Sequence, residues 1–363
     1  MDLAVNRHIG TGALSLMSAI QEPPASGLNL IGLSKNDYKG KASTLCKGCG
    51  HDSISARIIS VAYDLSIRPS RLIKMSGIGC SSKTPAYFLN QSHGFNGLHG
   101  RMPSISTGAL LANHTMAAIG ISGDGDTGSI GLGQFKHMVR RNVPMVYIIE
   151  NNGVYGLTKG QFSATADEGQ KLKYAGLNEL PAIDVCLEAL VADCGFVARS
   201  FAGDPRQVEQ LLKAAFSHNG TAVLDIISPC VSFNDHEDST KSYAWGKAHE
   251  EIINEFSFIP ARQEITVDYA EGESVDVTMH DGAIVRLRKL DGKHDPTDRY
   301  AAMRLLEDAH RSQELITGLI YLDESRQSLG EIEHLPATPL AQLSEEQLRP
   351  SKSTLDKLMA ELM

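Results

Sequence analysis

Two apolar segments, each ending in a glycine-rich polar turn and joined by a helical stretch, constrain the fold of this 363-residue chain most strongly. The first segment with its turn reads HTMAAIGISGDGD (residues 114–126), and the second reads VPMVYIIENNGVYG (residues 143–156). Between them, residues 129–142 have the apolar spacing of a helix. Strand, helix and strand in this order are typical of a right-handed unit with two parallel strands, so both polar turns are expected at the carboxyl edge of one sheet.

The same alternation continues through residues 45–232. The pattern predicts helices at residues 52–65, 182–195 and 205–220, and strands at residues 71–80, 195–204 and 221–230. Pro205 begins the third helix, where its missing N–H costs nothing. We therefore expect an α/β fold with a doubly wound, mostly parallel sheet that binds its ligands beyond the carboxyl ends of the strands.

Composition along the chain predicts three parts. Residues 1–40 are poorly patterned and proline-containing, so they are expected to form an N-terminal arm, followed by the α/β domain at residues 41–238. Residues 239–363 are expected to form a C-terminal extension. It is predicted to hold a small β unit at residues 263–290, a helix at residues 297–312 and a final helix at residues 352–362, with Leu355, Leu358, Met359 and Leu362 on one face. The extension carries no chemical motif, and we interpret it as structural or partner-contacting.

Charge and composition exclude several classes of partner. With 34 Lys and Arg against 43 Asp and Glu, the net charge is −9, which argues against nucleic-acid binding. No stretch approaches the ~18 apolar residues of a membrane span, and no targeting segment is expected at the N-terminus. Six cysteines in such a chain favour ligation or catalysis over a disulfide framework. We expect a cytoplasmic protein.

The two polar turns predict a site for a divalent cation and a diphosphate. Asp124 supplies a carboxylate after the first strand, Asn152 an amide oxygen after the second, and Val154 a backbone carbonyl two residues further on. Mg²⁺ prefers such oxygen ligands together with phosphates and water. Either turn alone is as typical of an ordinary loop. The pair, separated by one helix, favours the cation site.

The two turns resemble the GDG…NN signature of thiamine diphosphate enzymes. Three further motifs accompany them: GIGCSSK (residues 77–83), GLHGRMPSISTG (residues 97–108) and GLTKGQ (residues 156–161). Over residues 45–238 the chain is similar to the β subunits of 2-oxoacid:ferredoxin oxidoreductases, and most similar to the 2-oxoglutarate branch. The resemblance implies the diphosphate-binding half of a thiamine diphosphate fold, to which the C-terminal α+β extension is appended.

The resemblance also implies roles for particular residues. Asp124, Asn152 and the Val154 carbonyl match the Mg²⁺ ligands. Lys83 matches a lysine that meets the substrate carboxylate, and Lys159 lies in a loop that gates or tunes the substrate pocket. Both lysines are otherwise ordinary surface residues, and His99 is otherwise a core histidine. The positions that match contacts to the cofactor are Ile78, Gly79, Cys80, Ser81, His99, Gly123, Gly125, Asp126, Gly156 and Leu157.

The cysteines fall into two groups. Cys186 and Cys194 lie among apolar residues and are expected in the core. The C-x-x-C pair Cys46–Cys49 is by itself compatible with zinc, a redox dithiol, an iron–sulfur cluster or no ligand at all. With Cys80 and Cys230 it supplies four thiols, which suit a [4Fe–4S] cluster and equally a tetrahedral zinc ion. The family resemblance implies the cluster, although this chain has Lys47 where the family usually has proline.

The resemblance implies coenzyme A-dependent oxidative decarboxylation of 2-oxoglutarate, with electrons passing through the cluster to ferredoxin, and the reverse carboxylation. It further implies an α subunit that carries the pyrimidine-binding domain and its activating glutamate, in an αβ heterodimer paired into a tetramer. Three alternatives stay open: a pyruvate or broad-range 2-oxoacid enzyme, a non-catalytic iron–sulfur scaffold subunit, and a thiamine diphosphate synthase or decarboxylase with structural zinc.

Overall fold

A central eight-stranded sheet organises the chain in the computed structural model, which describes residues 27–172, 175–234, 239–252, 274–278, 284–288, 294–312 and 314–362. The strand order is β11 (Glu250–Ile252), β14 (Leu315–Leu322), β9 (Phe196–Phe201), β10 (Thr221–Ile227), β4 (Met145–Asn151), β3 (Ala117–Gly123), β1 (Leu72–Ser76) and β2 (His93–Asn96). Neighbouring strands are parallel except that β14 runs antiparallel to β9. The predicted α/β class with a mostly parallel sheet is confirmed.

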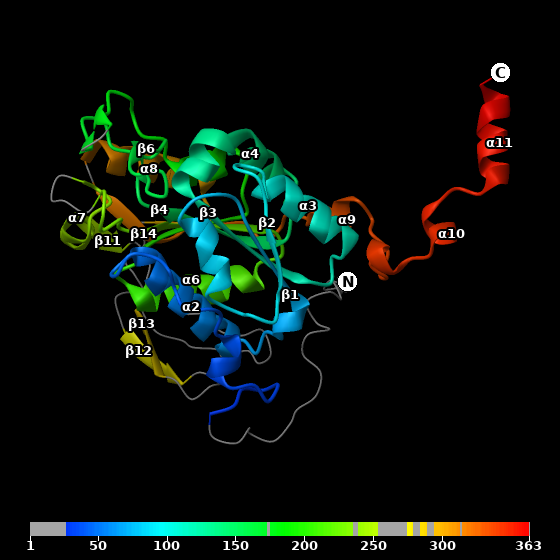
Figure 1. The fold of residues 1–363 in the computed structure, drawn as a ribbon, viewed down its shortest axis with the longest axis horizontal. Helices are drawn as coiled ribbons and strands as arrows, with labels where there is room; N and C mark the ends of the chain where they lie inside the picture. The colour runs from blue at the N-terminus through cyan, green and yellow to red at the C-terminus, as the bar shows by residue number, and fades with distance from the viewer. Residues whose placement is uncertain are drawn as a thin grey trace, which may run out of the picture.

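Helices cover both faces of this sheet (Figure 1). One face packs against α2 (Gly50–Asp64) and α6 (Pro205–Ser217), and the other against α3 (Met102–Ala112), α4 (Leu132–Arg140), α5 (Val185–Val191) and α8 (Arg299–Ser312). Every residue of β4, β9 and β10 is buried, which explains why these strands are mostly apolar in the sequence, although Glu150, Arg199 and Asp225 are charged residues within them. Cys186 and Cys194 are fully buried, as expected.

Local sequence fixes where these helices begin. The side chain of Asp204 accepts hydrogen bonds from the backbone N–H groups of Arg206 and Gln207, and Pro205 follows as the first residue of α6. Asp184 caps α5 in the same way. Helix α2 begins at Gly50, two residues earlier than the sequence pattern predicted, and Cys49 precedes it without a side-chain cap.

The strand register aligns the functional turns. Gly123 of β3 pairs with Glu150 of β4, and Asn151 of β4 pairs with Ile227 of β10. Because these strands are parallel and in step, the turns that follow them emerge side by side at the carboxyl edge. The turns after β1, β3, β4 and β10 are therefore neighbours in space although 150 residues separate the first from the last.

The C-terminal extension contributes directly to the central sheet. Strand β14 pairs with β9, its Ile316 and Ile320 are buried, and α8 packs on β14 and α5. The predicted domain boundary near residue 239 stays a prediction. Strands β12 (Ser274–Thr278) and β13 (Ile284–Arg288) form an antiparallel pair within the small β unit predicted at residues 263–290, and the other residues of that unit lie outside the described residues.

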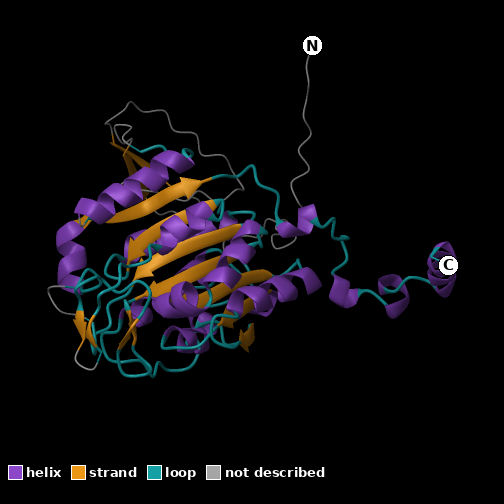
Figure 2. Cartoon of the chain, turned by 90° about the horizontal axis from the view of Figure 1, so that it is seen from above, coloured by secondary structure: helices purple, strands orange, loops and turns teal. Residues whose placement is uncertain are grey.

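The last part of the chain leaves the body as an extended arm that ends in two short helices, α10 (Glu345–Leu348) and α11 (Lys352–Glu361), as Figures 1 and 2 show. The predicted final helix is confirmed. Its apolar residues Leu355, Leu358, Met359 and Leu362 are all more than half exposed. In the part of the chain that the structure describes, no helix is both long and apolar enough to cross a membrane.

We predict that Ile320→Ala lowers the free energy of unfolding by about 2–5 kcal/mol, because it opens a cavity in the core that Ile320 shares with Val197 and Leu306. The exposed position Leu355 is the matched control, and Leu355→Ala is expected to leave stability unchanged. Denaturant unfolding of the two variants measures the difference. An unchanged midpoint for Ile320→Ala would show that β14 is not part of the cooperative core.

Candidate cofactor site

A cavity opens at the carboxyl edge of the sheet, where the turns after β1, β3 and β4 meet. All the positions predicted to contact cofactor or Mg²⁺ line this cofactor cavity. The lining comprises His51, Ile78, Gly79, Cys80, Ser81, His99, Gly123, Asp124, Gly125, Asp126, Glu150, Asn152, Val154, Tyr155, Gly156, Leu157 and Thr158. Residues that are up to 107 positions apart in the sequence, His51 and Thr158, thus face one space.

Asp124 is the most constrained acid of the cavity. Its carboxylate accepts hydrogen bonds from the backbone N–H groups of Asn152 at 3.3 Å and Gly153 at 3.1 Å, and from the hydroxyls of Thr165 at 2.7 Å and Ser163. Burial raises the pKa of Asp124, whereas the hydroxyl hydrogen bonds oppose that shift. A nearby cation would favour the ionised form of Asp124. The four hydrogen bonds hold its carboxylate in one place, which suits a residue that binds a metal ion.

Asp126 has a different function in the same turn, because it ties three segments together. Its carboxylate accepts from the backbone N–H of Gly100 at 2.7 Å, pairs with the His99 ring and accepts from the Ser122 hydroxyl at 2.8 Å. A Cβ on Gly77 would lie 2.0 Å from an Asp126 oxygen, so only glycine fits there. The side chain of Asp126 is thus already engaged with the protein, and the cofactor contact predicted at this position is to its backbone.

The remaining predicted residues lie around this centre. The Asn152 side chain accepts from the Val154 N–H at 3.1 Å, and the Val154 carbonyl accepts from Gly156 N–H at 3.1 Å. A Cβ on Gly125 would lie 2.4 Å from the Tyr155 ring, whose hydroxyl donates to the Gly125 carbonyl. Glycine at position 125 thus lets the Tyr155 ring pack directly against the turn.

The two predicted lysines do not line the cofactor cavity. Lys83 is half-buried in the helical turn Ser81–Ala86, where its charge acts on the Cys80 thiol. Lys159 is exposed, with a positive φ of 76°. Their predicted roles toward substrate stay predictions.

The loop that carries Cys46 and Cys49 docks on the segment after β10. Gly50 N–H donates to the Pro229 carbonyl at 3.3 Å, and the Ser232 hydroxyl donates to Cys46 Sγ at 3.3 Å. A Cβ on Gly156 would lie 3.6 Å from the sulfurs of both Cys80 and Cys230. The four predicted ligand cysteines therefore come from three turns that gather at one end of the cofactor cavity.

The thiols influence one another. Burial raises the pKa of Cys49 to about 12, and burial together with neighbouring cysteines raises the pKa values of Cys80 and Cys230. No set of three or more His, Cys, Asp or Glu side chains within the described ranges is close enough to hold a metal ion. The cysteines are thus neighbours, but they do not form a closed ligand set.

Two buried residues of the cavity were not predicted from the sequence. Glu150 is fully buried, and neither carboxylate oxygen has a hydrogen-bond partner; His51 Nδ1 lies 3.7 Å from one of them. Burial raises the pKa of Glu150 well above its usual range and lowers the pKa of His51 to about 4. Glu150 is the next-to-last residue of β4, and an acid at the carboxyl end of an apolar strand was the available signal.

We predict that Glu150→Gln stabilises the chain, measured without thiamine diphosphate and Mg²⁺, and more at pH 8 than at pH 5. Because the folded-state pKa is raised, the native chain keeps a proton that the unfolded chain loses, so native stability falls as pH rises above the usual value of 4.5. Melting temperatures should differ by about 2 °C or more at pH 8. The exposed control Glu346→Gln should show no such difference, and equal effects at both pH values would contradict the assignment.

The class of domain follows from the fold and this cavity. Residues 77–226 match the family described as thiamine pyrophosphate enzyme, C-terminal TPP binding domain. A mostly parallel sheet with the GDG and NN turns side by side is thus a thiamine diphosphate-binding domain, and the predicted fold class is confirmed.

Individual relatives point to a more specific family within the thiamine diphosphate-binding proteins. A 2-oxoacid:ferredoxin oxidoreductase β subunit from Aeropyrum pernix is 40% identical over 194 residues, which is 53% of this chain and 60% of that protein. The 2-oxoglutarate synthase subunit KorB of Methanocaldococcus jannaschii is 33% identical over 189 residues, which is 52% of this chain and 69% of the relative. A solved 2-oxoglutarate:ferredoxin oxidoreductase from Magnetococcus marinus is 27% identical, with a TM-score of 0.69, and the match covers 91% of this chain and 96% of that chain.

The chain belongs to the family of 2-oxoacid:ferredoxin oxidoreductase β subunits. The predicted family is confirmed. The matched region spans 60–65% of the length of the three relatives from Aeropyrum, Sulfolobus and Saccharolobus solfataricus.

Proposed function

We propose that this chain is the β subunit of a 2-oxoglutarate:ferredoxin oxidoreductase. The reaction is the coenzyme A-dependent oxidative decarboxylation of 2-oxoglutarate to succinyl-CoA, with electrons leaving for ferredoxin, and its reverse. One observation carries the proposal: the predicted diphosphate and cation positions face a single cavity, and Cys80 lines that cavity and also neighbours Cys230. Thiamine diphosphate, when bound, supplies the carbanion stabilisation that decarboxylation needs.

The residues around Asp124 fit a diphosphate with Mg²⁺. Asp124, Asn152 and the Val154 carbonyl would hold the cation, because all three offer oxygen at one end of the cavity. Glycines at positions 79, 123 and 125 leave backbone close to the space, and Asp126 fixes the 99–100 loop against it. Burial keeps bulk water from this end of the cavity and so strengthens the interaction with a bound cation.

The four cysteines fit a [4Fe–4S] cluster in residue type and in neighbourhood. Cys46, Cys49, Cys80 and Cys230 belong to the loops that meet beside the cavity, and ligation would require deprotonation of thiols whose pKa values burial raises at Cys49, Cys80 and Cys230. A cluster held by these cysteines would supply single-electron transfer beside the cofactor cavity.

The cavity is incomplete without a second chain. Large apolar side chains are exposed at and near its rim, including Ile78 and Leu157, which line it, and Leu98 next to His99. Exposed apolar surface around a polar cavity is typical of a subunit interface. We propose that an α subunit with the pyrimidine-binding domain covers this rim and supplies the activating glutamate, in an αβ heterodimer paired into a tetramer.

We base the proposed substrate on the names of the relatives. The Methanocaldococcus relative is named a 2-oxoglutarate synthase subunit, and the Magnetococcus structure contains 2-oxoglutarate, coenzyme A and succinyl-CoA. Lys83 would meet a carboxylate of such a substrate, and Lys159 lies in the loop that would gate or tune the substrate pocket. Pyruvate or a broader range of 2-oxoacids is the second candidate, and the substrate assay below separates the two.

We predict that the chain co-purified with its α subunit reduces a viologen with 2-oxoglutarate and coenzyme A, faster than with pyruvate. Asp124→Asn should lower this activity by at least about 100-fold and weaken Mg²⁺-dependent thiamine diphosphate binding, because the buried carboxylate is lost. The β chain alone should be inactive. Activity of the β chain alone would contradict the need for the α subunit, and a complex that binds no thiamine diphosphate would contradict the proposal as a whole.

We predict that Cys230→Ser and Cys49→Ser abolish the broad visible absorption of an iron–sulfur cluster in anaerobically purified protein. Cys186→Ser is the matched control, because Cys186 is buried in the core away from the cavity and should leave iron content unchanged. A colourless wild-type protein with one zinc ion per chain would favour a structural zinc site. A brown protein without turnover in the full complex would favour an electron-transfer scaffold.

A further inference from the structure

We infer that Arg199 and Asp225 are positioning residues for Asp124, acting through a buried chain of hydrogen bonds behind the cofactor cavity. The inference rests on the proposed function, in which Asp124 binds Mg²⁺. It assigns a role to a second cavity, on the far side of Asn151 and Thr165, that part of the C-terminal extension covers.

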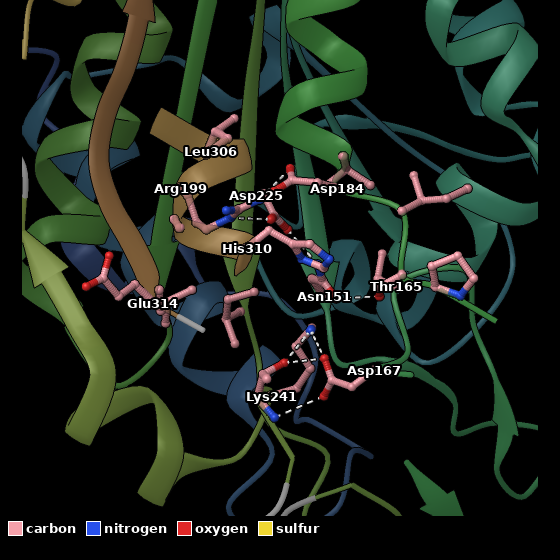
Figure 3. Close-up of a pocket in the computed structure, with 18 of the residues that line it drawn as sticks. Asn151, Thr165, Asp167, Asp184, Arg199, Asp225, Lys241, Leu306, His310 and Glu314 are labelled. Atoms are coloured by element: carbon pink, nitrogen blue, oxygen red, sulfur yellow. Dashed lines mark hydrogen bonds and ion pairs between the residues drawn. The ribbon is translucent and has the colours of Figure 1, made fainter. Parts of the chain in front are cut away.

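The chain of contacts is continuous. Arg199 Nε donates to Asp225 Oδ2 at 2.8 Å, and Asn151 Nδ2 donates to Asp225 Oδ1 at 3.0 Å. The Thr165 hydroxyl lies 2.8 Å from Asn151 Oδ1 and 2.7 Å from Asp124 Oδ2. Figure 3 shows Arg199, Asp225, Asn151 and Thr165 along the wall of this second cavity.

The donors and acceptors along this chain allow only one orientation of the Asn151 amide. The Asp225 carboxylate only accepts, so the NH₂ group of Asn151 must face it and the amide oxygen must face Thr165. Asn151 therefore cannot turn over, and its amide oxygen fixes where the Thr165 hydroxyl lies. That hydroxyl has one proton for two acceptors, so it donates either to the amide oxygen or to Asp124 Oδ2 while its oxygen stays in contact with both. A fixed hydroxyl holds Asp124 in one rotamer before any cation arrives, which is how outer-shell groups tune a metal site.

Arg199 is the charged partner that allows the buried Asp225 carboxylate to accept hydrogen bonds in the core. Asp225 is completely buried, and its charge would be costly without the guanidinium at 2.8 Å. Arg199 also pairs with Asp184 at 2.7 Å, the residue that caps α5, so it is held from a second side. The guanidinium thus links the start of α5 to β10.

The C-terminal extension covers the ion pair between Arg199 and Asp225. Leu306, Ala309 and His310 of α8 line the second cavity together with Arg199, and Lys241, which also lines it, pairs with Asp167 at 2.9 Å. Figure 3 shows His310 reaching toward the same space as Asn151 and Asp225. Covering the ion pair lowers the exposure of Arg199 to 8% and so strengthens its hold on Asp225.

The test measures Mg²⁺ affinity of the αβ complex at saturating thiamine diphosphate, by calorimetry and by Mn²⁺ competition. Thr165→Val and Asp225→Asn should each weaken Mg²⁺ binding about 10-fold or more, the range measured for outer-shell variants. At saturating Mg²⁺ their kcat should stay within about 3-fold of the wild type. Thr165→Ser keeps the hydroxyl and should restore near-wild-type affinity.

Thr221→Val is the matched control, because this threonine is equally buried and hydrogen-bonded, to the Val143 carbonyl at 2.7 Å, at the opposite edge of the sheet. If Thr221→Val weakens Mg²⁺ binding as much as Thr165→Val, or if neither Thr165→Val nor Asp225→Asn changes it, the positioning role is wrong. A wild-type complex without Mg²⁺-dependent cofactor binding would instead overturn the proposed function. Should Asp225→Asn fail to fold, the pair of Thr165 variants still decides.

Discussion

The hydrogen bonds that hold the buried carboxylate of Asp124 are the constraint on which the rest of this site depends. A carboxylate that is 2% exposed needs donors, and here they come from the Asn152 and Gly153 backbone and from two hydroxyls of the following loop. Those donors reach Asp124 only if strands β3 and β4 end at the same level of the sheet. The register in turn depends on strands that are buried on both faces, so the apolar core and the polar site specify each other.

Most of the fold was predictable because the strands are buried on both sides. Such strands are mostly apolar runs, and β3, β4, β9 and β10 all follow this rule, with β3 ending at Gly123 and β4 at Asn151. The place of β14 was not predictable: it joins the sheet antiparallel beside β9, more than 110 residues away, and no local pattern encodes that partner. The start of α2 was missed for a related reason, since Gly50 is held by Pro229 across the fold.

The candidate site was predictable in part. The positions of Asp124, Asn152 and the 78–81 turn follow from turn chemistry at strand ends, and the cavity brings them together. Glu150 escaped notice because a single acid in an apolar strand gives no periodic signal. The relay through Asn151, Thr165 and Asp225 was equally hidden, because its members come from three separate segments and each looks like an ordinary buried polar residue.

The cofactor cavity and the candidate cluster site share residues, so a movement in one site affects the other. Gly156 lies beside the sulfurs of Cys80 and Cys230 and also lines the cofactor cavity, so a side chain at this position would intrude on both. Cys80 follows β1 directly in the turn that contacts Asp126 through the Ile78 N–H at 3.4 Å. A shift of the cofactor turn therefore moves a candidate cluster ligand with it. Because protein interiors are close-packed, such a shared wall couples the geometry of the two sites more tightly than a flexible loop would.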